Sequence, residues 1–99
     1  MIDLQAYKTN VIDLCEKHNV DHLYLFGSAV SGNFNAASDV DFLVLFRQMD
    51  LHNYFSNYSD LKQQLEILFK RKVDLLEEQT IKNPVLKKSI ERTKVLVYG

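Results

Sequence analysis

The chain has 99 residues, of which 46% are hydrophobic and 25% charged, as in an ordinary globular domain. Its net charge is −1, so the chain does not have the excess of basic residues that is typical of proteins that bind a nucleic-acid backbone. No apolar run approaches the ~18 to 20 residues of a membrane span, and the first residues show no signal-peptide pattern. We therefore expect one domain over residues 1–99, in the cytoplasm, with no membrane partner and no strong nucleic-acid signature.

Helical and strand patterns alternate along the chain. Helices are indicated by apolar residues three and four apart, and strands by short runs of aliphatic, β-branched and aromatic residues. The expected elements are helices over 2–18, 54–69 and 84–91, strands over 22–26, 40–46, 72–76 and 95–98, and one helical turn at 29–31 within a loop. A short connection between the first two strands, and a helix between the second and third, predict a small mixed sheet in an α+β fold.

Several residues whose side chains could be reactive or bind ligands are interpreted as structural or exposed. Cys15 is the only cysteine, which excludes an internal disulfide, and its place on an apolar helix face predicts a buried, inert thiol. The three histidines, His18, His22 and His52, show no ligand spacing, so we expect structural or exposed roles. The basic run 70–72 is interpreted as a solvated helix end.

The helix over 54–69 has one main apolar stripe, expected to pack against the sheet. Phe55, Ile67 and Phe69 lie off that stripe as we interpret it. They predict a second apolar surface, and hence a protein partner.

Two aspartates lie at the start of the second expected strand, although carboxylates are poor strand formers and are costly to bury. Asp39 and Asp41 are two residues apart, so they project from the same strand face with roughly 6.5 to 7 Å between their Cα atoms. Carboxylates this close repel each other unless a cation lies between them, and Mg²⁺ is suited to such oxygen ligands. Asp74, on the third predicted strand, supplies a third carboxylate if that strand lies alongside.

The loop before these aspartates is suited to an anion. Gly27 has no side chain to block a phosphate, Ser28 offers a hydroxyl and a backbone N–H, and Gly32 permits a sharp return. A helical turn at 29–31 would direct free N–H groups at the same anion. An anion cradle beside a site for divalent cations describes a pocket for a metal–nucleoside triphosphate.

The sequence resembles a known superfamily at these residues. Gly27-Ser28, ten intervening residues and Asp39-x-Asp41, followed by an isolated strand aspartate, resemble the nucleotidyltransferases typified by DNA polymerase beta. The similarity is closest to the minimal nucleotidyltransferases (MNT proteins) and covers FGSAVSG, SDVDFLV and KVDLL. It implies a polymerase beta-like fold, metal binding by Asp39 and Asp41, a ligand and base role for Asp74, and triphosphate binding by Gly27 and Ser28.

The resemblance also implies an activity. We expect a nucleotidyltransferase that uses two Mg²⁺ ions to move AMP, from ATP or a related nucleoside triphosphate, onto a hydroxyl. MNT proteins are commonly paired with a helical HEPN toxin, so the expected acceptor is a tyrosine of such a partner and the expected role is that of antitoxin. Two alternatives stay open, namely a non-catalytic module that neutralises a toxin by binding and an enzyme that modifies a small molecule such as an antibiotic. A homo-oligomer also stays open.

Two features depart from the family pattern. Many relatives carry a basic residue directly after Gly-Ser, where this chain has Ala29 and Val30, so one phosphate contact is missing or comes from elsewhere. The second domain of larger relatives, which grips the base and the acceptor, is also missing from this sequence.

Overall fold

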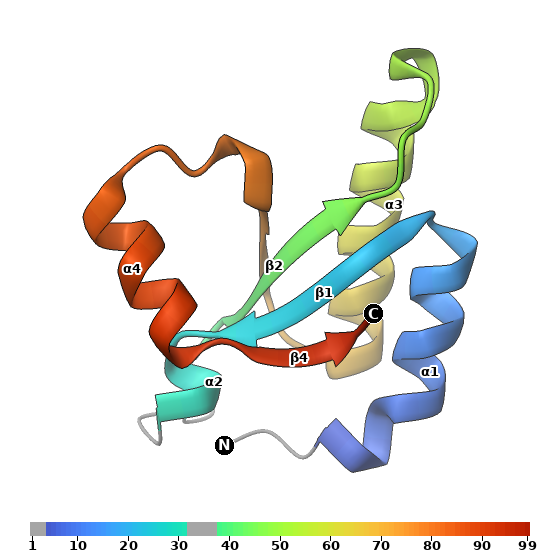
Figure 1. Cartoon of the computed structure of the whole chain (residues 1–99). Coiled ribbons are helices and arrows are strands. Elements are labelled where there is room, and N and C mark those ends of the chain that lie inside the picture. Colours follow the sequence, from blue (N-terminus) through green and yellow to red (C-terminus); the bar gives the residue numbers. More distant parts are fainter. Residues whose placement is uncertain (1–3, 32–37) are drawn as a thin grey trace.

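The computed structural model describes residues 4–31 and 38–99, and the expected order of elements is confirmed (Figure 1). The elements are α1 (Leu4–Lys17), β1 (Val20–Phe26), α2 (Ser28–Ser31), β2 (Val40–Phe46), α3 (Leu51–Phe69), β3 (Val73–Glu77), the 3₁₀ turn η1 (Glu78–Thr80), α4 (Pro84–Thr93) and β4 (Val95–Tyr98). No helix in the described ranges is long and apolar enough to cross a membrane.

The four strands form one mixed sheet in the order β3-β2-β1-β4. Strand β2 runs parallel to β3 and antiparallel to β1, and β4 pairs antiparallel with β1. The expected α+β fold with a small mixed sheet is therefore confirmed, and β2 lies inside the sheet. Because β2 and β3 are parallel, both begin at the same end of the sheet.

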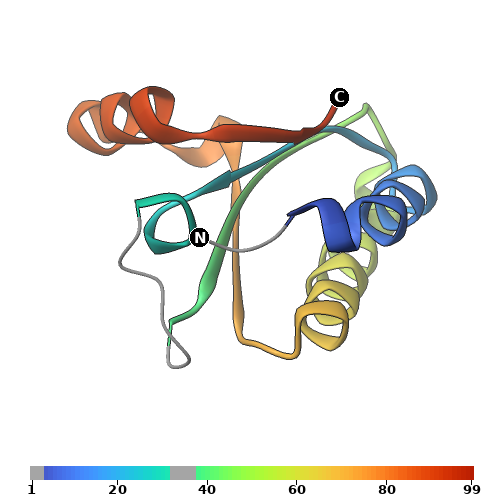
Figure 2. The same ribbon diagram turned by 90° about the horizontal axis from the view of Figure 1, so that it is seen from below.

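Helices cover both faces of the sheet. Helices α1 and α3 lie on one side and α4 on the other (Figure 2). The larger core packs Val11 and Cys15 of α1 and Leu65 of α3 against alternate sheet residues such as Phe42. A smaller cluster under α4 joins Ile90 to Leu43, Phe26 and their neighbours. Alternate residues of β2 therefore face opposite layers.

Strand β1 and helix α3 begin earlier than the sequence patterns predict. Strand β1 starts at Val20, directly after Asn19, whose φ of 57° turns the chain out of α1. Helix α3 starts at Leu51 because the carboxylate of Asp50 accepts a hydrogen bond from the backbone N–H of His52 at 3.1 Å.

The expected grouping of Phe69 with an exposed surface is wrong. Phe69 is 5% exposed and lies in the core, with ring centroids 4.6 Å from Tyr7 and 5.6 Å from Phe42. It follows Leu65 by one helical turn and so extends the buried stripe. Phe55 and Ile67 are exposed at 81% and 61%, as expected.

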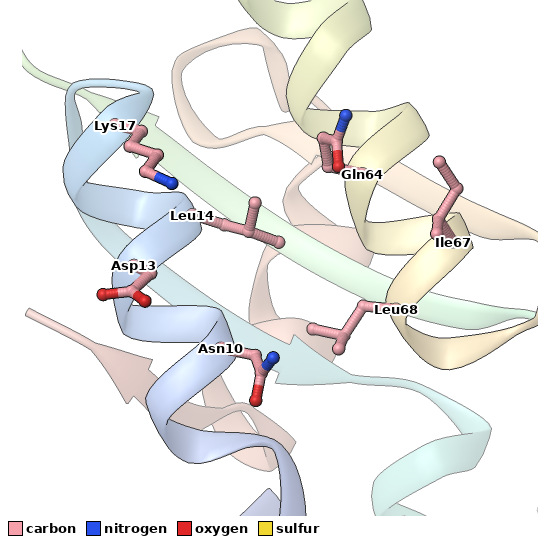
Figure 3. A pocket seen from close by; sticks show the side chains of 7 residues that line it. All are labelled: Asn10, Asp13, Leu14, Lys17, Gln64, Ile67 and Leu68. Atoms are coloured by element: carbon pink, nitrogen blue, oxygen red, sulfur yellow. The ribbon is translucent and has the colours of Figure 1, made fainter.

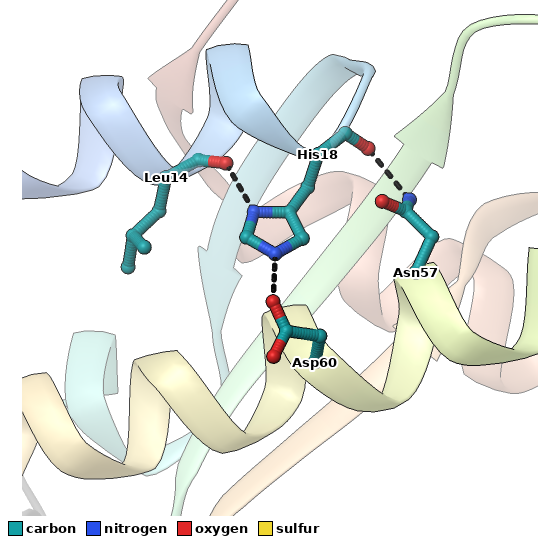
Figure 4. Close-up of polar contacts among 4 residues, drawn as sticks. All are labelled: Leu14, His18, Asn57 and Asp60. Carbon is teal, nitrogen blue, oxygen red and sulfur yellow. Dashed lines mark hydrogen bonds and ion pairs between the residues drawn. The ribbon is translucent and has the colours of Figure 1, made fainter.

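His18 is buried and has a structural role (Figure 4). Its Nδ1 donates to the carbonyl of Leu14 at 2.7 Å, and its Nε2 lies 2.6 Å from Oδ2 of Asp60. Asn57 donates its side-chain amide to the backbone carbonyl of His18 at 2.7 Å. These bonds join the end of α1 to the middle of α3. Cys15 is also buried as expected, and burial, followed by the charge of Glu16, raises the pKa of its thiol to about 12.

Candidate active site

Asp41 and Asp74 lie side by side in the parallel ladder of β2 and β3, where they are register partners. Neighbouring strands are about 4.8 Å apart, and register partners project to the same face. The residues on either side of Asp41, Val40 and Phe42, are buried in the layer of α1 and α3. Both carboxylates therefore project to the opposite face of the sheet, and Asp74 is exposed on the edge strand.

Asp39 lies directly before β2 and is exposed. Burial raises the pKa of the Asp41 carboxyl, and the charges of Asp74 and Asp39 raise it further. Asp74 and Asp39 are thus close enough to Asp41 for their charges to act on its carboxyl group.

Gly27 occupies the turn between β1 and α2, immediately beside Asp41. Its φ is 75°, and a Cβ at this position would lie 2.2 Å from Oδ2 of Asp41. Only glycine combines this backbone conformation with so close an approach. The glycine that the sequence assigns to phosphate binding therefore lies against one of the candidate carboxylates.

The expected helical turn after Gly27 is α2, which begins at Ser28. The carbonyl of Gly27 accepts a hydrogen bond from the N–H of Val30 at 3.1 Å. Ala29 is fully buried, which anchors the turn to the core. The start of α2 is thus held next to Asp41, whereas Gly32, the expected return of the loop, lies outside the described residues.

The three carboxylates suit a divalent cation in their chemistry. Within the described residues, no three His, Cys, Asp or Glu side chains already converge as a metal cluster. Burial, and then repulsion from Asp74 and Asp39, nevertheless raises the pKa of Asp41, and a bound cation would remove that repulsion. Carboxylate oxygens are also the ligands that Mg²⁺ prefers.

The turn from α3 to β3, whose basic residues the sequence indicates only as a solvated helix end, lies beside the aspartates. The guanidinium of Arg71 donates to the carbonyl of Ser38 at 3.1 Å, and the N–H of Val40 donates to the carbonyl of Lys72 at 3.0 Å. Continuing the register of Asp41 with Asp74 places Lys72 opposite Asp39. The pattern of residues near 72 carries no signal for this, because the pairing of two distant strands creates it.

A hollow of about 250 Å³ between α1 and α3 lies on the other side of the sheet (Figure 3). Leu14, Ile67 and Leu68 form its apolar part, and Lys17 and Gln64 are among its polar lining. None of the predicted site residues lines it, so the candidate active site is the acidic end of the sheet.

Comparison with known proteins identifies the family of the chain. Residues 9–99 match the family model described as polymerase beta nucleotidyltransferase. The chain belongs to the polymerase beta nucleotidyltransferase family. It is a minimal nucleotidyltransferase, as the resemblance of its motifs implied, and the predicted polymerase beta-like fold is confirmed.

Individual relatives share most of the chain. A candidate protein adenylyltransferase of Methanocaldococcus jannaschii is 41% identical over 86 residues, which is 85% of this chain and 83% of the relative. The solved structure of a candidate minimal nucleotidyltransferase, 29% identical, aligns over 95% of both chains with a TM-score of 0.77. A further similar structure is a complex of a tri-AMPylated Shewanella oneidensis HEPN toxin with an MNT antitoxin. The alignment with one chain of that complex covers 98% of this chain and 73% of the matched chain, with 22% identity and a TM-score of 0.67.

Proposed function

We propose that this nucleotidyltransferase transfers AMP from ATP to a tyrosine hydroxyl of a HEPN-type toxin, using Mg²⁺, and so acts as an antitoxin. The observation that carries the proposal is the pairing of Asp41 with Asp74 across two strands, with Gly27 packed against the Asp41 carboxylate. The relative from Methanocaldococcus jannaschii is named for adenylyl transfer to protein, and the Shewanella complex contains an AMPylated HEPN toxin. Both support the choice of nucleotide and acceptor.

The strand order divides the proposed site into two sides. Gly27 and the start of α2 follow β1, on one side of Asp41, and Asp74 lies on β3, on the other side. The triphosphate is therefore assigned to the side of Gly27 and the N–H groups of α2, where no Cβ intervenes. The side of Asp74, the exposed residue of the edge strand β3, is left for the acceptor.

The reaction needs a proton acceptor and charge neutralisation. The acceptor oxygen attacks the α-phosphorus of ATP, the bond from that phosphorus to the bridging oxygen of the β-phosphate breaks, and pyrophosphate leaves. Asp74, exposed on the acceptor side, takes the proton of the attacking hydroxyl. Asp39 and Asp41, with Asp74, would hold two Mg²⁺ ions, which neutralise phosphate charge and polarise the α-phosphoryl group when bound.

A partner is proposed to complete the site. We treat residues 1–99 as one catalytic domain, and the acceptor side is bounded by the edge strand β3. A HEPN-type protein that brings its tyrosine to this edge would close the site and exclude water.

Transfer of labelled AMP tests the proposal. The chain is incubated with ATP labelled at the α-phosphate, Mg²⁺ and the HEPN-type protein proposed as its partner, and we expect label on a tyrosine of that protein. Asp41→Asn and Asp74→Asn should abolish labelling without unfolding the chain. Tight binding to the partner with no label, unchanged in both variants, would instead identify a non-catalytic binding module. Labelling of an aminoglycoside by the chain alone would identify a small-molecule enzyme.

A further inference from the structure

The turn that leads into β3 is positively charged and adjoins the acceptor side of the proposed site. Lys70, Arg71 and Lys72 follow one another there, and both lysines are exposed. The turn is fixed in place, since Arg71 donates to the carbonyl of Ser38 and the carbonyl of Lys72 accepts from Val40. The backbone that carries these cations is therefore held at a defined position beside the entry to β2.

Lys72 is the member of this turn closest in register to the aspartates. It lies opposite Asp39 when the β2–β3 register is continued, and it precedes Asp74 by two residues, which places it on the same face. Its Cα is thus about 6.5 Å from that of Asp74. Within the described residues, no ion pair joins Lys72 to Asp39.

The position of Lys72 argues against a role at the triphosphate. Gly27 and the start of α2 lie beyond Asp41 on the β1 side, whereas Lys72 is on the β3 side. A cation at this place faces whatever approaches the edge strand. It attracts negative charge in the acceptor and repels positive charge.

We propose that Lys72 selects acceptors that carry acidic residues next to the modified tyrosine. This inference rests on the proposed function, because it uses the same aspartates and the same acceptor side. Lys72 would contact the carboxylate that flanks the hydroxyl-bearing residue, and the neighbouring cations of the turn would add a field of the same sign.

Three synthetic peptides test this selection. They share one tyrosine and differ only in its two neighbours, which are glutamates, alanines or lysines. With Mg²⁺ and ATP, the wild-type chain should modify the glutamate peptide about tenfold more efficiently than the lysine peptide, through the KM for peptide and not for ATP. The preference should weaken as ionic strength rises.

Charge reversal gives the sharper comparison. Lys72→Gln should remove the preference, Lys72→Glu should invert it in favour of the lysine peptide, and Lys72→Arg should retain it. Lys8→Glu is the matched control, because it makes the same change of charge at an exposed position on α1; it should behave as wild type. Anisotropy of the fluorescently labelled peptides, measured with a non-hydrolysable ATP analogue, gives the same comparison without turnover.

The outcomes separate this inference from the proposed function. Equal use and equal binding of the three peptides by wild type, or an unchanged preference in Lys72→Glu, overturns the role of Lys72 while AMP transfer to the HEPN-type protein still stands. A chain that transfers no AMP to either peptide or protein, and binds no Mg²⁺–ATP, overturns both.

Discussion

Oδ2 of Asp41 lies 2.2 Å from the position that a Cβ of residue 27 would take. The carboxylate of Asp41 therefore fills the space that a side chain at Gly27 would need, at the end of β1. The two residues are far apart in sequence and meet because Phe26 pairs with Asp41 in the antiparallel ladder of β1 and β2. The register of one strand pair thus joins the proposed phosphate turn to the proposed metal site.

Gly27→Ala should damage both stability and the site. The φ of 75° costs an alanine about 1 to 2 kcal/mol, and displacement of the Asp41 carboxylate adds to this cost. We expect a lower free energy of unfolding in urea and the loss of AMP transfer. Introduced together with Asp41→Ala, the same change should cost only the backbone part, because the clash is gone; equal costs in the two backgrounds would show that the carboxylate does not occupy this space.

Asp41→Asn should abolish the effect of Mg²⁺ on stability with little change in the fold. A ligand that binds only the folded state raises the melting temperature, so Mg²⁺ should stabilise the wild type and not the variant. Because Asp41 is partly buried among like charges, the amide should leave the metal-free protein as stable as the wild type or more stable. An Asp41→Asn variant whose melting temperature still rises with Mg²⁺ would place the metal elsewhere.

The same substitution predicts a pH dependence. The pKa of Asp41 is raised in the folded state above its usual 3.8, first by burial and then by Asp74 and Asp39. Without metal, the contribution of this group to stability is complete below pH 3.8 and is lost as the pH rises through the folded-state pKa. Urea unfolding across this range should show a shallower decline for Asp41→Asn than for wild type. Saturating Mg²⁺ should oppose the wild-type decline, because the ion requires the ionised carboxylate.

The candidate site residues could be selected from the sequence because each of the motifs that carry them is local. Two aspartates with strand spacing, a Gly-Ser turn before them and a later strand aspartate were sufficient to select these residues, and the fold followed from alternating helix and strand patterns. Phe69 was misassigned because the buried face of α3 depends on how the helix rotates against Tyr7 and Phe42. Lys72 was interpreted only as part of a solvated helix end, because its place opposite Asp39 depends on a register between two strands that are distant in sequence.

Side chains of α3 cover the outer edge of β3. We expect these contacts to contribute to the free energy of unfolding and to protect the strand from hydrogen exchange. Oε2 of Glu66 accepts a hydrogen bond from the N–H of Val73 at 3.0 Å, and the hydroxyl of Tyr58 donates to the carbonyl of Leu75. These contacts satisfy backbone groups that an edge strand otherwise leaves open. Glu66→Ala should lower the free energy of unfolding by about 1 kcal/mol and speed hydrogen exchange at Val73.

Glu66→Gln is the matched control for this contact, because it keeps an acceptor oxygen while removing the charge. We expect it to retain most of the protection at Val73. Fast exchange in the Gln variant and slow exchange in the Ala variant would contradict the assigned hydrogen bond.

Tyr54 should govern part of the alkaline unfolding of the protein. Burial, and then its hydrogen bond to Glu77, raises the pKa of Tyr54 from 10.0 to about 12. The folded state therefore favours the neutral phenol, and its contribution to stability is complete below pH 10 and is lost as the pH rises through about 12. Tyr54→Phe should be less stable at neutral pH, through loss of the bond to Glu77, and should lose stability less steeply above pH 10.

Glu77→Gln separates the two causes of the raised pKa of Tyr54, which are burial and the interaction with Glu77. It keeps a hydrogen-bond acceptor for the phenol but removes the carboxylate charge, so the pKa of Tyr54 should fall only in part, because burial is the larger cause. The tyrosinate absorbance of the variant, compared with wild type and with Tyr54→Phe, gives that pKa directly. A return to the ordinary value of 10.0 would mean that Glu77, and not burial, sets it.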